Sequence, residues 1–145
     1  MTDIITFIKE ILPYEEYNHA YDVGFRCKTK GKAYAVALLH DIVEDGYATF
    51  EELQQSFDLD AEQMDALEAI TRRNGERYFD YIQRVKQNKI AKIVKLADLQ
   101  HNIERCARDL QNRWGLIRRY AKAYGILIDE WEEVHVNDKA TDQTD

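Results

Sequence analysis

The spacing of hydrophobic positions along the 145-residue chain predicts a succession of helices. Apolar residues return every three or four positions, the period of an amphipathic helix, and short polar breaks separate the segments. No segment shows a strand-like alternation that competes with the helical interpretation. The predicted helices cover residues 2–12, 14–27, 37–46, 49–57, 60–72, 76–85, 88–110 and 114–134. We therefore expect an all-α fold with one helical domain over residues 1–136, followed by a polar tail over 137–145 that we predict to be disordered.

Several helix boundaries have recognisable start and stop signals. Pro13 ends the first apolar pattern, because proline cannot donate the hydrogen bond that a helix interior needs. Thr49 with Glu52 has the spacing of a capping box, and so has Asp60 with Gln63. These signals divide the chain into a string of helices with short breaks.

Composition and charge limit the classes of protein to which the chain can belong. The chain is 45% hydrophobic and 32% charged, as expected for a soluble globular domain, and its net charge of −7 argues against binding nucleic acid through phosphate contacts. No apolar run reaches the length of about 20 residues that a membrane span requires. Cys27 and Cys106 lack the spacing of a metal or redox pair, so we interpret them as free, buried thiols. We expect a cytoplasmic protein with neither nucleic-acid nor membrane partners.

The segment "ALLHDIVEDG", residues 37–46, carries an unusual concentration of charge after an apolar run. If it is helical, His40 lies one turn before Glu44. Asp41 likewise lies one turn before Asp45, so the four side chains form two adjacent rows. Three acids beside an imidazole would repel and desolvate one another unless a positive charge or water lay between them.

A metal ion is one such positive charge. His40 and Asp41 follow the apolar run "YAVALL", and Asp98 follows "IAKIVKLA", so these carboxylates emerge from segments that must be buried. A carboxylate at the edge of a core is costly unless it is paired or bound to metal. Together with His19, the residues would make a mixed nitrogen and oxygen site for a borderline divalent ion with positions left for water. We favour Mn²⁺, with Fe²⁺, Zn²⁺, Ni²⁺ and Mg²⁺ as alternatives.

The same residues resemble a known arrangement. His19, the "HD" at 40–41 and Asp98 resemble the metal-binding H…HD…D set of the HD-domain phosphohydrolase superfamily. The segments "ALLHDIVED" and "VKLADLQHN" are similar to the subgroup that contains the (p)ppGpp hydrolases, and the likeness spans residues 17–105. It implies an HD-type helical bundle in which the metal ligands are His19, His40, Asp41 and Asp98.

The resemblance also implies roles beside the metal. Glu44 and Asp45 match the acidic pair that orients or deprotonates the attacking water, and Asn102 matches a residue beside the substrate. The chain departs from the subgroup around "YNHA" at 17–20, where the preceding basic segment that helps hold the guanine nucleotide is missing. We therefore do not transfer (p)ppGpp as the substrate. The expected function is a metal-dependent phosphohydrolase acting on a small nucleotide or another phosphate ester. The alternatives are a nucleotide-sensing module without turnover and a structural dimer with a vestigial site.

Other polar residues leave two interpretations open. Arg72 and Arg73 either bind substrate phosphate or are cations that favour the end of a helix. Lys95 lies three residues before the predicted ligand on its helix, so it either approaches the phosphate or pairs with a nearby acid; we favour the former. We assign neither His101 nor His135 to the metal.

Aromatic residues recur in the last predicted helix at Tyr120, Tyr124 and Trp131. We interpret them as core residues or as the surface of a homodimer rather than as a platform for stacking bases. The oligomeric state stays open at this point.

Overall fold

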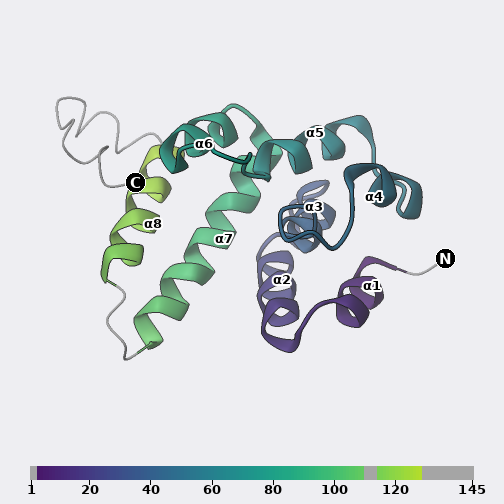
Figure 1. The fold of residues 1–145 in the computed structure, drawn as a ribbon, viewed down its shortest axis with the longest axis horizontal. Helices are drawn as coiled ribbons and strands as arrows, with labels where there is room; N and C mark the ends of the chain where they lie inside the picture. Colours follow the sequence, from purple (N-terminus) through teal and green to yellow (C-terminus); the bar gives the residue numbers. More distant parts are fainter. Residues whose placement is uncertain (1–2, 110–113, 129–145) are drawn as a thin grey trace.

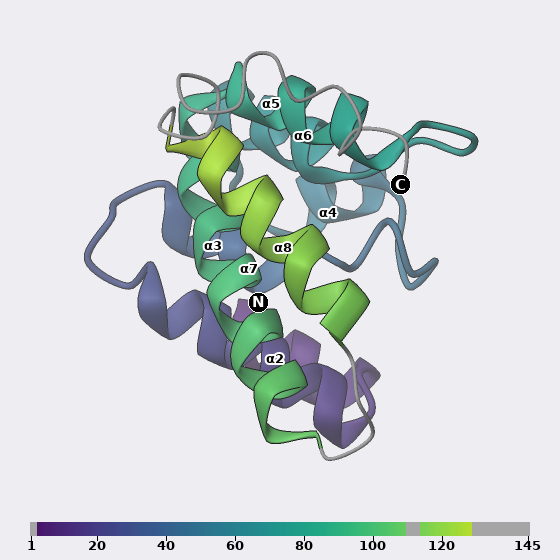
Figure 2. The ribbon, with the colours of Figure 1, turned by 90° about the vertical axis from the view of Figure 1, so that its left-hand side faces the viewer.

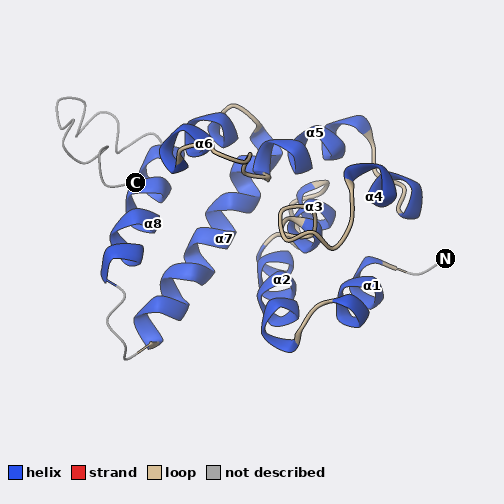
Figure 3. Ribbon diagram, viewed as in Figure 1, coloured by secondary structure: helices blue, strands red, loops and turns tan. Residues whose placement is uncertain are grey.

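The computed structural model describes residues 3–109 and 114–128, and within these residues it contains eight α-helices and no strand (Figures 1 and 3). The predicted all-α class is confirmed. The predicted tail and the end of the last predicted helix lie outside the described residues. The helices are α1 (Ile4–Ile11), α2 (Tyr14–Arg26), α3 (Ala33–Leu39), α4 (Phe50–Ser56), α5 (Ala61–Ile70), α6 (Tyr78–Lys86), α7 (Lys89–Arg108) and α8 (Trp114–Leu127).

Polar side chains start several of these helices. The carboxylate of Asp3 accepts a hydrogen bond from the Thr6 N–H, so Asp3 caps α1. Thr49 caps α4 through its hydroxyl oxygen, which accepts a hydrogen bond from the Glu52 N–H. Within the described residues, only this half of the capping box predicted at Thr49 and Glu52 is formed. Asp60 and Gln63 form the predicted capping box at the start of α5, in which each side chain accepts a hydrogen bond from the other residue's backbone N–H.

The predicted helix over residues 37–46 is wrong in its extent. The helix α3 ends at Leu39, and residues 40–46 form successive turns. The His40 side chain donates from Nδ1 to the Ala37 carbonyl at 2.6 Å, and the His40 N–H points to the same oxygen. These two donors occupy the carbonyl to which the Asp41 N–H would bond in a continuing helix. Gly46, with φ of +81°, then ends the turns.

The helix α7 is the centre of the bundle. It packs against α2, α3, α5, α6 and α8, and α8 runs alongside it in both views (Figures 1 and 2). Leu39, Leu67 and Leu99, from three different helices, are almost completely buried in the common core. Cys27 and Cys106 are free and buried, as predicted. Within the described ranges, no helix combines the length and apolar character needed to cross a bilayer.

A glycine sets the distance between α2 and α3. A Cβ atom added at Gly24 would lie 2.4 Å from the Leu38 side chain, so only a residue without a side chain fits there. The close approach matters for the site because α2 carries His19, and His40 directly follows α3.

Candidate metal centre

Three segments bring the four predicted ligands together. His19 comes from α2, His40 and Asp41 directly follow α3, and Asp98 comes from α7. The Asp98 Oδ1 atom lies 2.9 Å from His19 Nε2 and 3.3 Å from His40 Nε2. The Asp41 Oδ2 atom lies 3.1 Å from His40 Nε2 and 3.6 Å from His19 Nε2. His19, His40 and Asp41 lie close enough for all three to bind one metal ion.

The ligand atoms lie at the boundary between core and solvent. The side chains of Asp98 and the two histidines are at most 6% exposed, whereas the Asp41 side chain is 40% exposed. This gradient leaves one side of the group open to water, which a hydrolytic metal site requires.

The fit of a metal ion rests on the unsatisfied nitrogen of His40. Because Nδ1 donates to the Ala37 carbonyl, Nε2 of the neutral ring has a free lone pair that faces the two carboxylates. This Nε2 is buried, and although the two carboxylates lie 3.1 and 3.3 Å away, neither is aligned for a hydrogen bond with it, nor is any other group among the described residues. Burial lowers the pKa of His40, but Asp41 and Asp98 outweigh it and hold the pKa well above its usual value. The position therefore favours a positive charge, which a divalent cation can supply in place of the proton.

Lys95 and Asn102 hold Asp98 from α7. The Lys95 Nζ atom lies 2.8 Å from Asp98 Oδ2, and the Asn102 amide donates to Asp98 Oδ1 at 3.3 Å. Burial alone would raise the pKa of Asp98, but Lys95 and the two imidazoles hold it well below its usual value. Of the two interpretations of Lys95, pairing with an acid is the one seen here, while the same side chain also lines the cavity at the site.

The two predicted catalytic acids point into different surroundings. The Glu44 carboxylate accepts a hydrogen bond from the Arg72 N–H at 2.8 Å. Asp45 lines a separate small cavity together with Glu16. Partial desolvation and the carboxylates of Asp41 and Glu44 raise the pKa of Asp45 to about 6. Asp45 can therefore gain or lose a proton near neutral pH.

Two cavities of opposite character adjoin the metal group. The acidic cavity, of about 210 Å³, contains Glu16 and Asp45. The other, of about 270 Å³, contains Glu44 and Asp98 but also four cationic side chains; we call it the cationic cavity. His19, Asp41 and Arg105 line both cavities. The cations of the cationic cavity are Arg72, Lys95, Arg105 and Arg119.

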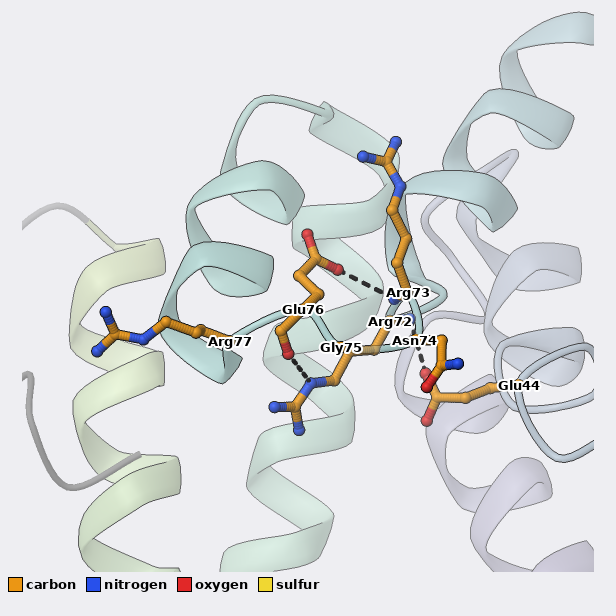
Figure 4. Close-up of a pocket in the computed structure, with 7 residues that line it drawn as sticks. All are labelled: Glu44, Arg72, Arg73, Asn74, Gly75, Glu76 and Arg77. Atoms are coloured by element: carbon orange, nitrogen blue, oxygen red, sulfur yellow. Dashed lines mark hydrogen bonds between the residues drawn. The ribbon is translucent and has the colours of Figure 1, made fainter.

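A third, wider cavity of about 780 Å³ lies over the loop of residues 71–77, which we call the arginine loop (Figure 4). The guanidinium of Arg72 donates from Nε to the Glu76 carbonyl and lies over the Tyr78 ring. Arg72 lines this outer cavity and the cationic cavity, whereas Arg73 lines only the outer one and its side chain points away from Glu44. Of the two arginines, only Arg72 therefore lies at the metal group.

Sequence reasoning missed several residues at the site. Arg105 could have been found, because Lys95, Asp98, Asn102 and Arg105 share one face of α7 by their spacing. No sequence signal points to the residues that α6 and α8 contribute, because they reach the site only through helix packing. These residues are Tyr78, Tyr81, Arg119 and Tyr120, all of which line the cationic cavity.

Two aromatic residues of α8 are placed differently from one another. Tyr120 lines the cationic cavity, and the Tyr124 hydroxyl accepts a hydrogen bond from the Gln100 amide. Both pack against the core, in agreement with one of the two interpretations.

Trp131 and His135 lie outside the described residues. His101 is not among the three residues that could hold one metal ion, but it contacts His19 through a ring nitrogen.

Comparison with known proteins adds no identification. No family model matches the chain, and no curated protein matches it. The fold and the site therefore define the class by themselves: an all-helical protein with a His and Asp group that can bind a metal ion. The resemblance to the HD-domain phosphohydrolases stays a prediction.

Proposed function

We propose that the protein is a metal-dependent phosphohydrolase that acts on a small phosphorylated substrate, a nucleotide or another phosphate ester. The observation that carries the proposal is the buried His40 Nε2, which has no hydrogen-bond partner among the described residues and faces Asp41 and Asp98. A buried imidazole nitrogen with a free lone pair beside two carboxylates is a ligand set for a borderline divalent cation. We propose Mn²⁺, held by His19, His40, Asp41 and Asp98.

The cationic cavity supports phosphate as the substrate group. Although the chain has a net charge of −7, this cavity beside the metal group gathers Arg72, Lys95, Arg105 and Arg119. Guanidinium groups suit phosphate because their planar N–H donors match its oxygens. The side-chain amide of Asn102 also lines the cationic cavity. These side chains would bind and orient the phosphate, and the proposal gives Arg72, Lys95 and Asn102 that role.

The acidic side of the site supports a hydrolytic reaction. When bound, a divalent ion held by His19, His40, Asp41 and Asp98 would lower the pKa of a water molecule and polarise a phosphoryl oxygen. Asp45, with a pKa of about 6, can take the proton that this water loses and return it to a leaving group. Glu44 faces the cationic cavity, where its free oxygen can orient the water.

A panel of substrates tests the proposal directly. Purified protein is loaded with Mn²⁺ and incubated with nucleoside mono-, di- and triphosphates, bis-phosphorylated nucleotides and simple phosphate esters, and released phosphate or pyrophosphate is measured. We expect turnover of at least one compound that is lost on chelation and in Asp41→Ala. No release from any compound, with bound Mn²⁺ confirmed by metal analysis, would contradict the proposal.

One observation favours a second candidate, a nucleotide-sensing module without turnover. The Glu44 carboxylate is already engaged by the Arg72 N–H, which reduces its capacity to act on water. A sensor would bind a nucleotide with Mn²⁺ present, form no product, and bind equally well in Glu44→Gln. Measuring binding and product in the same samples distinguishes the two functions.

A further inference from the structure

His19 and His101 meet through equivalent ring nitrogens. The Nδ1 atoms of the two imidazoles lie 2.6 Å apart, between α2 and α7. One of the two atoms must carry the proton and the other must accept it, because two unprotonated nitrogens would repel at this distance. The side chain of His101 is 12% exposed, so little water competes for this contact.

The surroundings of His101 favour one of the two proton arrangements. Its other nitrogen, Nε2, lies 3.8 Å from the carboxylate of Asp22. Asp22 is held in place by Arg26, whose Nε donates to the same carboxylate oxygen at 2.7 Å. A negative charge on this side favours a proton on His101 Nε2. Nδ1 of His101 is then available to accept a proton from Nδ1 of His19.

This arrangement has a consequence for the metal group. With the proton on Nδ1, the Nε2 atom of His19 presents its lone pair to Asp41 and Asp98 and can bind a cation. In the opposite tautomer, Nε2 carries the proton and donates to Asp98 at 2.9 Å, an arrangement that the buried carboxylate favours as long as no cation is bound. A cation on Nε2 takes the place of this proton, and Nδ1 of His19 must then carry a proton and donate it to His101. His101 therefore acts on the site without belonging to the ligand set.

We propose that His101 is a positioning residue that holds His19 in its metal-binding tautomer, with Asp22 orienting His101 in turn. This inference rests on the proposed metal site. It assigns a function to a histidine that sequence reasoning left without one. It also gives a function to the contact between His19 of α2 and His101 of α7 beside the site.

The first test reads the tautomer in the unmodified protein. The protein is labelled with ¹⁵N-histidine, stripped of metal with a chelator, and its imidazole nitrogens are assigned by single replacement of each histidine. The protein is then loaded with Zn²⁺, and we expect Nε2 of His19 to bind the ion and Nδ1 of His19 to carry the proton, with Nδ1 of His101 unprotonated. A proton on Nδ1 of His101 in the Zn²⁺-loaded protein, or Zn²⁺ bound through Nδ1 of His19, would overturn the inference.

The second test compares two replacements of His101. His101→Leu removes the acceptor, whereas the side-chain oxygen of His101→Asn can accept near the position of Nδ1. We expect Mn²⁺ affinity to fall about 10–100-fold in His101→Leu, the range known for partners of metal-binding histidines, and to return to within a few-fold in His101→Asn. Arg108→Gln is the matched control, since Arg108 is an exposed residue of the same helix, away from Arg26 and Asp22 in the contacts described.

The outcomes separate this inference from the proposed function. Equal affinity in His101→Leu and the unmodified protein would overturn the positioning role and leave the metal site standing. Equal loss in the Leu and Asn variants would also overturn it, because the effect would then follow the imidazole and not the acceptor. If the unmodified protein binds neither Mn²⁺ nor Zn²⁺, the proposed function fails together with this inference.

Discussion

The candidate metal centre and the arginine loop lie side by side but are built in opposite ways. The metal centre draws its ligands from α2, the turns after α3, and α7, and buries most of them. The arginine loop is one continuous segment, 71–77, at the surface of the molecule. Charge is therefore concentrated by tertiary packing in one region and by local sequence in the other.

The two regions also differ in how their charges are satisfied. In the arginine loop, Glu76 pairs with Arg84, and the Arg84 guanidinium also donates to backbone carbonyls at the end of α5, including those of Ala69 and Thr71. In the metal centre, His40 Nε2 has carboxylates nearby but no hydrogen bond within the described residues. The difference teaches that the buried acid of the loop is already paired by a cation of the protein, whereas the metal centre fits an added cation.

The largest effect expected is the loss of the metal itself. Asp41→Ala should abolish Mn²⁺ binding and any hydrolytic activity together, because it removes a ligand whose carboxylate faces both imidazoles. Glu44→Gln should keep the metal and slow turnover, because Glu44 contacts the arginine loop and not the imidazoles. Metal analysis of both variants, alongside the substrate panel, checks this. Equal metal loss in the two variants would show that the ligand set is assigned wrongly.

Removal of the metal should also destabilise the fold. An ion held by three separate segments stabilises the folded state by about 2.7 kcal/mol when free metal is a hundredfold above its dissociation constant. Chelation should therefore lower the melting temperature by several degrees, and Mn²⁺ should restore it. Asp98→Asn should blunt this response, because it removes a ligand charge and keeps the shape. A melting curve that chelation leaves unchanged, after metal analysis confirms removal, would exclude this role.

The arginine loop should respond to pH instead of metal. Hydrogen bonds from Arg84 lower the pKa of Glu76 to about 2, and its side chain is only 14% exposed. A lowered pKa stabilises the fold above the unfolded value near 4.5 and stops doing so as pH falls through about 2. Glu76→Gln should therefore cost about 2 kcal/mol at pH 7 and progressively less between pH 4.5 and 2, as judged from urea unfolding.

Two controls sharpen that measurement. Glu51→Gln, at an exposed position in the first turn of α4, should show no comparable loss. Mn²⁺ affinity in Glu76→Gln should stay close to that of the unmodified protein, because Glu76 does not contact the metal group. A destabilisation that is the same at pH 7 and pH 2.5 would argue against the Glu76 and Arg84 pair as its cause.

The smallest effect expected separates the two neighbouring arginines. Arg72→Ala should raise KM for a phosphorylated substrate about tenfold, or about 1.4 kcal/mol, because its side chain lines the cationic cavity. The bond from its backbone N–H to Glu44 survives this replacement. Arg73→Ala should change KM less than threefold, since Arg73 lines only the outer cavity. Equal changes in the two variants would contradict the placement of the substrate beside Arg72.

Local signals determined much of what could be known from the sequence alone. The capping box at Asp60 and Gln63 and the cap at Thr49 appear where they were predicted, because such motifs are satisfied within one turn of chain. The all-α class follows from apolar periodicity for the same local reason. The extent of the helix after Ala37 was predicted wrongly, because a histidine side chain competes there for a backbone carbonyl.

Tertiary structure decided what surrounds the predicted ligands. His19, His40 and Asp98 could be singled out in the sequence, but their approach to within about 3 Å depends on the packing of α2 and α3 against α7. Arg119 enters the cavity from α8, and no pattern along α8 distinguishes it from its neighbour Arg118. The contact between His19 and His101 spans 82 positions of sequence, and a pairing at that separation is set by how helices pack and not by local spacing.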